Sequence, residues 1–276
     1  MPFVTNETGA EEVDIFFQDY GEGQAVILIH GWPLSHQAWE GQINEIVEAG
    51  YRCIAYDRRG FGISSEPWES YDYSTLASDL HEIIEQLDLE DVIIVGFSMG
   101  GGEVVRYLTD YGSDKIAKAA LISSIIPLVA QKDDNPNGVP QEALNDIMTA
   151  LKDNRVAFLK DFHKNFYNFD ENKDRMTEAN LEYDFSIASH ASPNATVKAA
   201  NSWATTDFRS ELKNVTVPTL IVHGDADNIV PIQTSAEQAA KGINNNEYHI
   251  IKGGPHGLNL THKKELNKIL LEFLKK

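Results

Sequence analysis

The segment Asp91-Val92-Ile93-Ile94-Val95-Gly96-Phe97-Ser98-Met99-Gly100 joins an aliphatic run to a Gly-x-Ser-x-Gly motif, and a helix-like segment follows at once. A serine between a strand and a helix in this way is typical of a nucleophile elbow. The turn is sharp, and glycine on both sides of the serine removes the Cβ atoms that would block it. The helix N-terminus beneath the serine supplies free N–H groups and a positive dipole end for a developing oxyanion. The pattern therefore predicts Ser98 as a nucleophile.

Two other glycine-rich motifs do not fit this segment. A dinucleotide-binding turn needs the spacing G-x-G-x-x-G, which is absent around Gly96. A phosphate-binding loop needs Gly-Lys-Ser/Thr, which does not occur in the chain. Serine chemistry is therefore the interpretation that the motif favours.

Short apolar runs alternate with helix-like segments on both sides of this junction. Strands are predicted at 13–18, 25–29, 52–56, 92–95, 119–122, 219–222 and 247–251. Helices are predicted at 39–49, 74–87, 101–111, 235–240 and 263–274. Strands that are apolar throughout are covered on both faces, as in parallel sheets with crossover helices. The sequence therefore predicts an α/β fold with a mostly parallel, doubly wound sheet.

Residues 125–206 interrupt this alternation. They begin with a polar, turn-rich stretch and continue with helix-like segments in which Phe158, Phe162 and Phe166 are four residues apart. An insertion of about 80 residues is longer than an ordinary crossover needs. We therefore expect a helical cap at 125–206, inserted into a core domain formed by residues 1–124 and 207–276. The alternative is that these helices are simply part of the main domain.

Composition and charge argue against several classes of partner. The chain has 276 residues, 42% of them hydrophobic, and 23 basic against 42 acidic residues, which gives a formal net charge of −19. Such a chain repels polyanions, so neither nucleic acid nor an anionic membrane surface is expected as a partner. No apolar stretch is long enough to span a bilayer. The single cysteine, Cys53, cannot form an intrachain disulfide, and no signal-peptide pattern is visible, so the expected compartment is the cytoplasm.

A serine hydroxyl needs an adjacent base, and after a nucleophile elbow the partners follow in the order Asp/Glu, then His. His256 lies in the loop Gly-Gly-Pro-His-Gly after the last predicted strand, and it is the predicted base. The loop after the strand at 219–222 offers two aspartates, Asp225 and Asp227. One of them would hold the imidazole in its productive tautomer, and the other would accept backbone N–H bonds within the loop.

An oxyanion hole needs two N–H donors that point at the developing charge. The backbone N–H of Met99, directly after the nucleophile, is the first expected donor. The second should come from His30-Gly31-Trp32-Pro33, the loop after the strand at 25–29. Trp32 is the expected donor because Pro33 has no N–H. We expect a structural role for His30, with hydrogen bonds to nearby backbone.

Several segments closely resemble the cofactor-free haloperoxidase/perhydrolase group of α/β-hydrolases, whose members are often also called arylesterases. The resemblance is carried by Tyr-Asp-Arg-Arg-Gly-Phe-Gly-Ile-Ser at 56–64 and Phe-Ser-Met-Gly-Gly-Gly-Glu at 97–103, with agreement at 30–33, 71–79, 203–209, 223–231 and 254–258. It covers most of the chain and is weakest in the expected cap. By motif match, the triad of the family falls on Ser98, Asp227 and His256, and its oxyanion donors fall on Trp32 and Met99.

The resemblance implies an α/β-hydrolase fold and serine esterase chemistry on small aryl or short-chain esters, with no metal or other cofactor. It also implies a side reaction in which hydrogen peroxide replaces water on the acyl-enzyme and yields a peracid that oxidises halide. In this group, proline directly after the oxyanion tryptophan is associated with better perhydrolysis, and here that position is Pro33. Members are often oligomeric, so a homo-oligomer is among the expected states.

The substrate pocket is predicted from position and bulk. Its expected lining residues are Trp32, Pro33, Phe158, Phe162, Trp203 and Ile229. Two alternatives stay open on the same fold and triad: a lactonase or carbon–carbon bond hydrolase, and, more distantly, a ligand-binding signalling protein. Haloalkane dehalogenase and epoxide hydrolase chemistry are disfavoured, because those relatives need aspartate where Ser98 stands.

Overall fold

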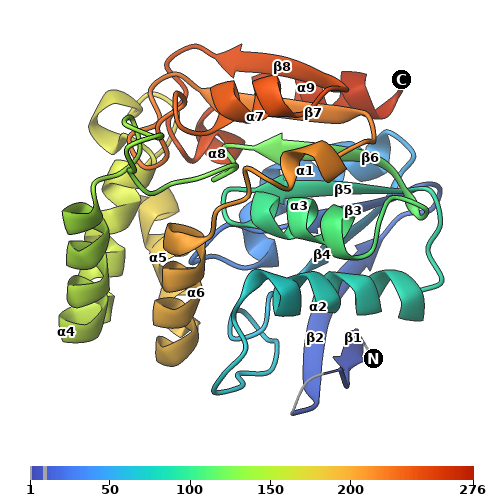
Figure 1. The fold of residues 1–276 in the computed structure, drawn as a ribbon, viewed down its shortest axis with the longest axis horizontal. Helices are drawn as coiled ribbons and strands as arrows, with labels where there is room; N and C mark the ends of the chain where they lie inside the picture. Colours follow the sequence, from blue (N-terminus) through green and yellow to red (C-terminus); the bar gives the residue numbers. More distant parts are fainter. Residues whose placement is uncertain (1, 9–10) are drawn as a thin grey trace.

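An eight-stranded sheet forms the centre of the computed structural model, which describes residues 2–8 and 11–276 (Figure 1). The strands lie in the order β1-β2-β4-β3-β5-β6-β7-β8. Their bounds are β1 Phe3–Asn6, β2 Val13–Tyr20, β3 Ala25–Ile29, β4 Arg52–Tyr56, β5 Val92–Phe97, β6 Ile116–Ile122, β7 Thr219–Gly224 and β8 Asn246–Ile251. β2 is antiparallel to both of its neighbours, and all other neighbouring strands are parallel. The predicted α/β fold with a mostly parallel sheet is confirmed.

Helices cover both faces of the sheet, which is why its central strands are apolar throughout. Successive side chains of a strand point to opposite faces. In β3, Ile27 and Ile29 belong to one apolar cluster, while Val26 and Leu28 belong to the other. The first cluster is covered by α2 (Tyr73–Gln86), α3 (Gly100–Asp110) and α7 (Ala236–Gly242). The second is covered by α1 (Glu40–Glu48), the short α8 (Leu258–Thr261) and α9 (Lys263–Leu274).

The first strand of the sheet, β1, is missing from the sequence-based prediction. It has four residues and lies at the edge of the sheet, where it pairs with β2. A strand of this length gives too few alternations for a period of two to stand out. The segments predicted at 25–29, 52–56 and 263–274 recur with the same ends as β3, β4 and α9. The other predicted strands and helices recur with ends shifted by a few residues, because local patterns define ends poorly.

A helical insertion follows β6 and lies beside the carboxyl edge of the sheet (Figure 1). It contains α4 (Gln141–Phe166), η2 (Phe169–Glu171), α5 (Glu178–His190) and α6 (Pro193–Thr205), and η3 (Leu212–Asn214) leads back to β7. The backbone of α4 breaks at Asn154, whose φ of −154° and ψ of 77° are not helical. The predicted helical insertion is confirmed, while residues 125 and 206 as domain boundaries stay a prediction.

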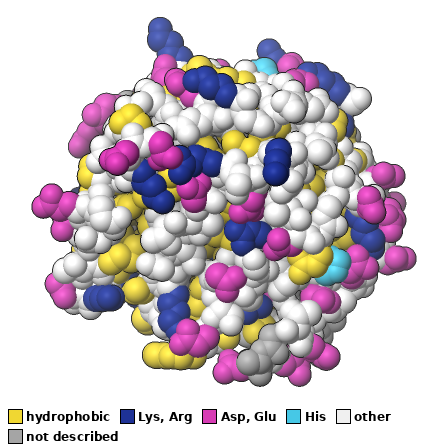
Figure 2. Space-filling model, in the orientation of Figure 1, with side chains coloured by type: hydrophobic (Ala, Val, Ile, Leu, Met, Phe, Trp, Pro, Cys, Tyr) yellow, Lys and Arg dark blue, Asp and Glu magenta, His cyan; other side chains and the backbone are white. Residues whose placement is uncertain are grey.

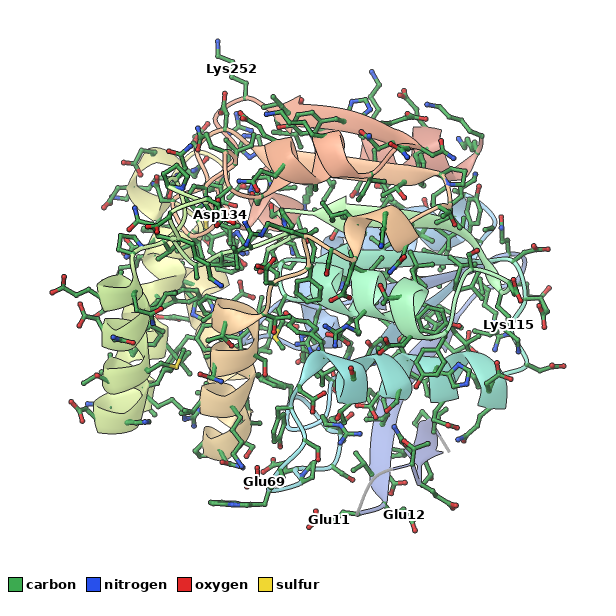
Figure 3. All side chains as sticks on the ribbon, in the orientation of Figure 1. Glu11, Glu12, Glu69, Lys115, Asp134 and Lys252 are labelled. Atoms are coloured by element: carbon green, nitrogen blue, oxygen red, sulfur yellow. The ribbon has the colours of Figure 1, made fainter. Side chains whose placement is uncertain are left out.

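The acidic surplus is spread over the visible surface. Figure 2 shows Asp and Glu side chains scattered among Lys and Arg on the face that it presents. In Figure 3 the labelled side chains of Glu69, Lys115 and Lys252 lie at the rim of the fold. On this face the net charge is therefore not concentrated in one tail. Within the described residues, every helix is too short or too polar to qualify as a membrane span.

A buried phenol–carboxyl pair joins two helices of the insertion. Tyr167 follows α4, and its hydroxyl donates a hydrogen bond to Asp184 on α5. Both residues are buried. Burial raises the pKa of Asp184 to about 6 from an ordinary value of 3.8, although the hydrogen bond from Tyr167 acts in the opposite direction. Between the two pKa values, 3.8 and about 6, the pair therefore holds a proton that the unfolded chain would release.

We expect Asp184→Asn to stabilise the protein, and to do so more at high pH. Well below pH 4 the Asp184 carboxyl group is protonated in both the folded and the unfolded state, so its burial costs no ionisation free energy. As the pH rises toward 6, only the unfolded state ionises, and stability falls by about 3 kcal/mol in total. The amide keeps an acceptor for Tyr167 and removes this cost. Urea unfolding should show a gain of about 3 kcal/mol at pH 7.5 and roughly half of that at pH 5.

The exposed Asp161 on α4 provides the control for this prediction. Asp161→Asn should change the unfolding free energy by less than about 0.5 kcal/mol at either pH. A gain for Asp184→Asn that is equal at the two pH values would contradict the ionisation argument.

Candidate active site

Three polar side chains meet at the carboxyl edge of the sheet, where parallel strands end. Ser98 follows β5, Asp227 follows β7 and His256 follows β8. The Oγ atom of Ser98 lies 2.8 Å from Nε2 of His256, and Nδ1 of His256 lies 2.7 Å from Oδ2 of Asp227. All three residues are buried to more than nine-tenths. The structure thus brings together the three residues that the sequence suggested as nucleophile, base and acid.

The backbone at Ser98 is strained in the way a nucleophile elbow requires. Ser98 has a φ of 54°, in the left-handed region that residues with a Cβ atom seldom adopt. A Cβ atom on Gly96 would lie 2.5 Å from the carbonyl oxygen of Gly100, and one on Gly100 would lie 2.5 Å from that of Ile29. No side chain fits at either place. The two glycines therefore permit the close approach of β5, α3 and β3 that presents the serine.

Asp227 accepts hydrogen bonds on both carboxylate oxygens. The backbone N–H groups of Ile229 and Val230 donate to Oδ1 over 2.9 Å and 2.8 Å. Oδ2 faces Nδ1 of His256 and, at 3.0 Å, Nε2 of His223. Burial alone would raise the pKa of Asp227, but the two histidines hold it well below its ordinary value. Asp227 is therefore an ionised carboxylate that can orient His256 and stabilise its imidazolium form.

His223 is a residue of this site that sequence reasoning missed. It is fully buried, and its Nε2 atom lies 3.0 Å from both the Asp227 carboxylate and the carbonyl oxygen of Val230. A nitrogen that faces two acceptors carries the proton, so His223 donates from Nε2. Among the described residues, Nδ1 of His223 has no hydrogen-bond partner. The only signal in the sequence was its place at the end of β7, four residues before Asp227.

The other aspartate of this loop points elsewhere. Oδ1 of Asp225 accepts a hydrogen bond of 2.6 Å from the backbone N–H of Gly253, in the loop that carries His256. Asp225 therefore connects the two loops, as expected for an aspartate that orders a turn. It makes no contact with His256, so the structure distinguishes the two aspartates that residue patterns left open.

The two expected oxyanion donors are both near Ser98. Trp32 is in the loop after β3, and Met99 is the residue directly after Ser98. The loop is close to the serine, because a Cβ atom on Gly31 would lie 3.0 Å from Cβ of Ser98. Within the described part of the chain, neither backbone N–H donates to another protein group. Free N–H groups beside a nucleophile are what an oxyanion hole needs, and this role of Trp32 and Met99 stays a prediction.

Four of the predicted pocket residues line one cavity of about 610 Å³ under the insertion: Phe158, Phe162, Trp203 and Ile229. The ring of Trp32 packs behind it, with ring centroids 5.4 Å from Phe162 and 5.8 Å from Trp203. Pro33 is buried next to Trp32, joined by a cis peptide bond, and does not line the cavity. Five of the six predicted residues therefore lie together at the cavity, and Pro33 is not one of its lining residues.

None of the three triad residues lines this cavity among the described residues, but two of its lining residues connect it to them. The N–H of Ile229 donates to Asp227, and the ring of Phe162 contacts that of Phe166, 5.6 Å away. Phe166 in turn packs edge-on against the imidazole of His256 at 4.8 Å. Phe166 was visible in the sequence only as the third member of a four-residue stripe. Through Phe166, the end of α4 packs directly against the imidazole of His256.

Comparison with known proteins places the chain in a family. Residues 24–263 match the family described as alpha/beta hydrolase fold. The chain is an α/β-hydrolase. It is 45% identical, over 99% of its own length and 100% of the relative, to a Synechocystis protein provisionally named a non-heme chloroperoxidase. It is also 34% identical, over 100% of both chains, to the bifunctional esterase/perhydrolase DCH of Acinetobacter calcoaceticus.

A solved structure of similar fold and sequence supports the same family for this α/β-hydrolase. The bromoperoxidase of Bacillus anthracis superposes with a TM-score of 0.95 at 44% identity, covering 99% of this chain and 100% of that one. The chain is therefore a serine hydrolase of the non-heme haloperoxidase and esterase/perhydrolase family. The resemblance noted in its motifs is confirmed.

Proposed function

We propose that this α/β-hydrolase cleaves small carboxylic esters through an acyl-enzyme on Ser98. His256 is the general base, and Asp227 is the carboxylate that orients it. The observation that carries the proposal is the continuous hydrogen-bond chain from Ser98 through His256 to Asp227, at 2.8 Å and 2.7 Å. A nucleophile, a base and an orienting carboxylate in this order are what acyl transfer requires.

The reaction begins when Oγ of Ser98 attacks the ester carbonyl and its proton passes to Nε2 of His256. The backbone N–H groups of Trp32 and Met99 stabilise the oxyanion. The tetrahedral intermediate collapses, the proton on His256 goes to the departing alcohol, and the acyl group stays on Ser98. Water then attacks the acyl-enzyme and gives a proton to His256. His256 returns this proton to Oγ of Ser98 as the carboxylic acid leaves.

The expected substrates are aryl or short-chain esters. The cavity has aromatic and aliphatic lining residues, among them Phe158, Phe162 and Trp203. Its polar lining residues are Asp153, Asn154, Asp161, Asn165 and Asn228. Apolar walls with a few polar groups suit small uncharged molecules. The Acinetobacter relative is named an esterase, which supports the same substrate class for this chain.

Hydrogen peroxide is the second acyl acceptor that we propose. Peroxide attacks the acyl-enzyme in place of water, one of its protons passes to His256, and a peracid leaves Ser98 free. The peracid then oxidises halide to hypohalous acid and becomes the carboxylic acid. Non-heme haloperoxidases and a perhydrolase among the relatives support this branch. We also retain the predicted cytoplasmic location and homo-oligomeric state as proposals.

Replacing Pro33 should shift the balance between the two acceptors. We expect the Trp32 carbonyl, held by Pro33, to accept a hydrogen bond from the attacking peroxide. Losing one such bond, worth about 1 kcal/mol, should lower the ratio of perhydrolysis to hydrolysis in Pro33→Leu about fivefold. Peracid and acid formation are measured on one aryl acetate with and without peroxide, and hydrolysis in the same variant serves as the control. An unchanged ratio would remove Pro33 from the peroxide branch.

Covalent labelling tests the proposed function directly. A fluorophosphonate should react with one residue, and peptide mass spectrometry should locate the adduct on Ser98. The same preparation should hydrolyse aryl acetates and lose this activity as the label is incorporated. An enzyme that stays unlabelled, or that keeps its activity when fully labelled, would refute the proposal.

A further inference from the structure

A buried ion pair lies close to the proposed active site but contains none of its residues. Arg58 follows β4, Glu103 lies in the first turn of α3, and neither side chain is exposed to solvent. Nε of Arg58 donates to Oε1 of Glu103 over 2.7 Å, and Nη2 contacts the same oxygen. The hydroxyl of Tyr56 donates to the other oxygen, Oε2, over 2.6 Å. Both oxygens of the Glu103 carboxylate therefore accept hydrogen bonds.

Arg58 also holds the loop that leads to Trp32. Its Nη2 atom donates to the carbonyl oxygen of His30 over 2.6 Å, and its backbone N–H donates to Nε2 of His30 over 3.0 Å. Because Nε2 accepts, the ring of His30 carries its proton on Nδ1 and donates to the carbonyl oxygen of Gly31, 2.9 Å away. Burial, followed by the nearby Arg58 charge, lowers the pKa of His30 well below its ordinary value. The two carbonyl groups before Trp32 are thus both fixed.

Glu103 lies on the helix that begins directly after Met99, the other expected oxyanion donor. Met99 precedes the first turn of α3, and Glu103 is the fourth residue after it. An α-helix is rigid over one turn, so a bond that fixes Glu103 also fixes the position of Met99. The ion pair therefore links the loop that carries Trp32 to the turn that carries Met99.

Stability alone does not explain this pair. Two charges lose their hydration when they are buried, and apolar replacements of similar volume are often equally or more stable. A guanidinium group, in contrast, presents its donors in a planar fork of fixed geometry. Here the fork contacts Glu103 and His30 together, which sets the distance between their two backbones.

We propose that the Arg58–Glu103 ion pair positions the two oxyanion N–H groups, those of Trp32 and Met99, at the spacing that the tetrahedral intermediate needs. Arg58 and Glu103 are positioning residues, since they act through His30 and α3 rather than on substrate. The inference rests on the proposed ester hydrolysis, because it assigns a role in stabilising its intermediate.

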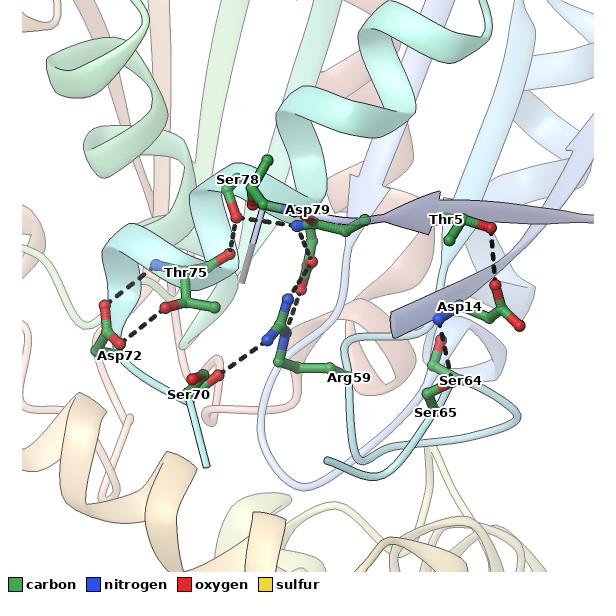
Figure 4. Close-up of polar contacts among 12 residues, drawn as sticks. Thr5, Asp14, Arg59, Ser64, Ser65, Ser70, Asp72, Thr75, Ser78 and Asp79 are labelled. Atoms are coloured by element: carbon green, nitrogen blue, oxygen red, sulfur yellow. Dashed lines mark hydrogen bonds and ion pairs between the residues drawn. The ribbon is translucent and has the colours of Figure 1, made fainter. Parts of the chain in front are cut away.

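A second buried ion pair offers a matched control. Arg59, the neighbour of Arg58, donates from Nε and Nη2 to the two oxygens of Asp79, at 2.7 Å and 2.6 Å (Figure 4). Their side chains are 4% and 1% exposed. The further contacts of this pair are the Ser70 carbonyl and the Asn6 side chain, away from the Trp32 loop. Disrupting it should destabilise the fold without moving an oxyanion donor.

The test compares Glu103→Gln with Asp79→Asn in the full-length enzyme. Each variant is characterised by urea unfolding, by kcat and KM for an aryl acetate, and by the inhibition constant of a trifluoromethyl ketone, which forms a tetrahedral oxyanion adduct on serine. We expect Glu103→Gln to lower kcat about 10²-fold, as loss of one oxyanion donor does, with KM changed less than about threefold. The ketone should bind more weakly by a similar factor. Asp79→Asn should keep kcat and ketone affinity within about threefold.

A double variant keeps the test decisive if a single one does not fold. Arg58→Met with Glu103→Leu removes both charges together and leaves no unpaired ion, so it should fold. It should still show the loss in kcat and in ketone affinity. Wild-type values in this variant, or an equal loss of kcat in Asp79→Asn, would overturn the proposal. A wild type that neither hydrolyses the ester nor binds the ketone would instead refute ester hydrolysis itself, and the role of the pair with it.

Discussion

Ser98→Ala is expected to lower kcat for aryl acetate hydrolysis about 10⁶-fold, because the nucleophile and its base work as one unit. Without Oγ no acyl-enzyme forms, and only direct attack by water on the bound ester remains. The oxyanion donors and the cavity stay in place, so some acceleration over the uncatalysed reaction should persist. Single-turnover measurements with a chromogenic ester, at high enzyme concentration, would reveal the size of the loss.

The control for this variant is its fold. The strain at Ser98 lies in the backbone, with φ at 54°, and alanine has the same backbone preference as serine there. Thermal unfolding should therefore stay close to that of the wild type. If Ser98→Ala retained more than about 1% of wild-type kcat while folded, another group would be the nucleophile.

Asp227→Asn should lower kcat about 10⁴-fold, which is the second largest effect we expect. The amide cannot accept on all the sides where His256, His223, Ile229 and Val230 now donate. Its NH₂ group would favour the tautomer of His256 that is protonated on Nε2, and that form cannot accept the Ser98 proton. Steady-state kcat and the rate of fluorophosphonate labelling should fall together, since both need the same activated serine.

Asp225→Asn is the matched control, two residues away in the same loop. Asp225 accepts the Gly253 N–H and does not touch His256. Asparagine keeps an oxygen acceptor for this N–H but makes a weaker bond than a carboxylate does, so we expect kcat within about tenfold of the wild type and a loss of less than about 1 kcal/mol in unfolding free energy. If the Asp225 variant lost more activity than the Asp227 variant, the acid would have been assigned to the wrong residue.

Much of the site was predictable because its parts are local in sequence. The elbow at 96–100 could be recognised from ten consecutive residues, since the glycines and the preceding aliphatic run all serve one turn. His256 and the Asp225/Asp227 loop could be recognised as loops that follow buried strands. Because parallel strands end at one edge of a sheet, these separate loops were expected to meet.

Other features depend on contacts between distant segments. The cavity needs Trp32 from one loop, Phe162 from α4 and Trp203 from α6, which are separated by more than 100 residues at the widest. A hydrophobic pattern shows that such side chains are buried but does not say which ones they meet.

The order of apolar strands and helices, the strained turn at Ser98 and the classes of residue that could serve as base and acid were determined by the sequence itself. These follow from short-range rules of backbone geometry and apolar periodicity, which act within a few residues. Tertiary structure decided that Asp227 rather than Asp225 faces His256 and that Phe166 packs against the imidazole. It also decided that Arg58 binds both Glu103 and the carbonyl oxygen of His30. Side-chain partners of this kind are selected by how strands and helices pack, and 45 residues of chain separate Arg58 from Glu103.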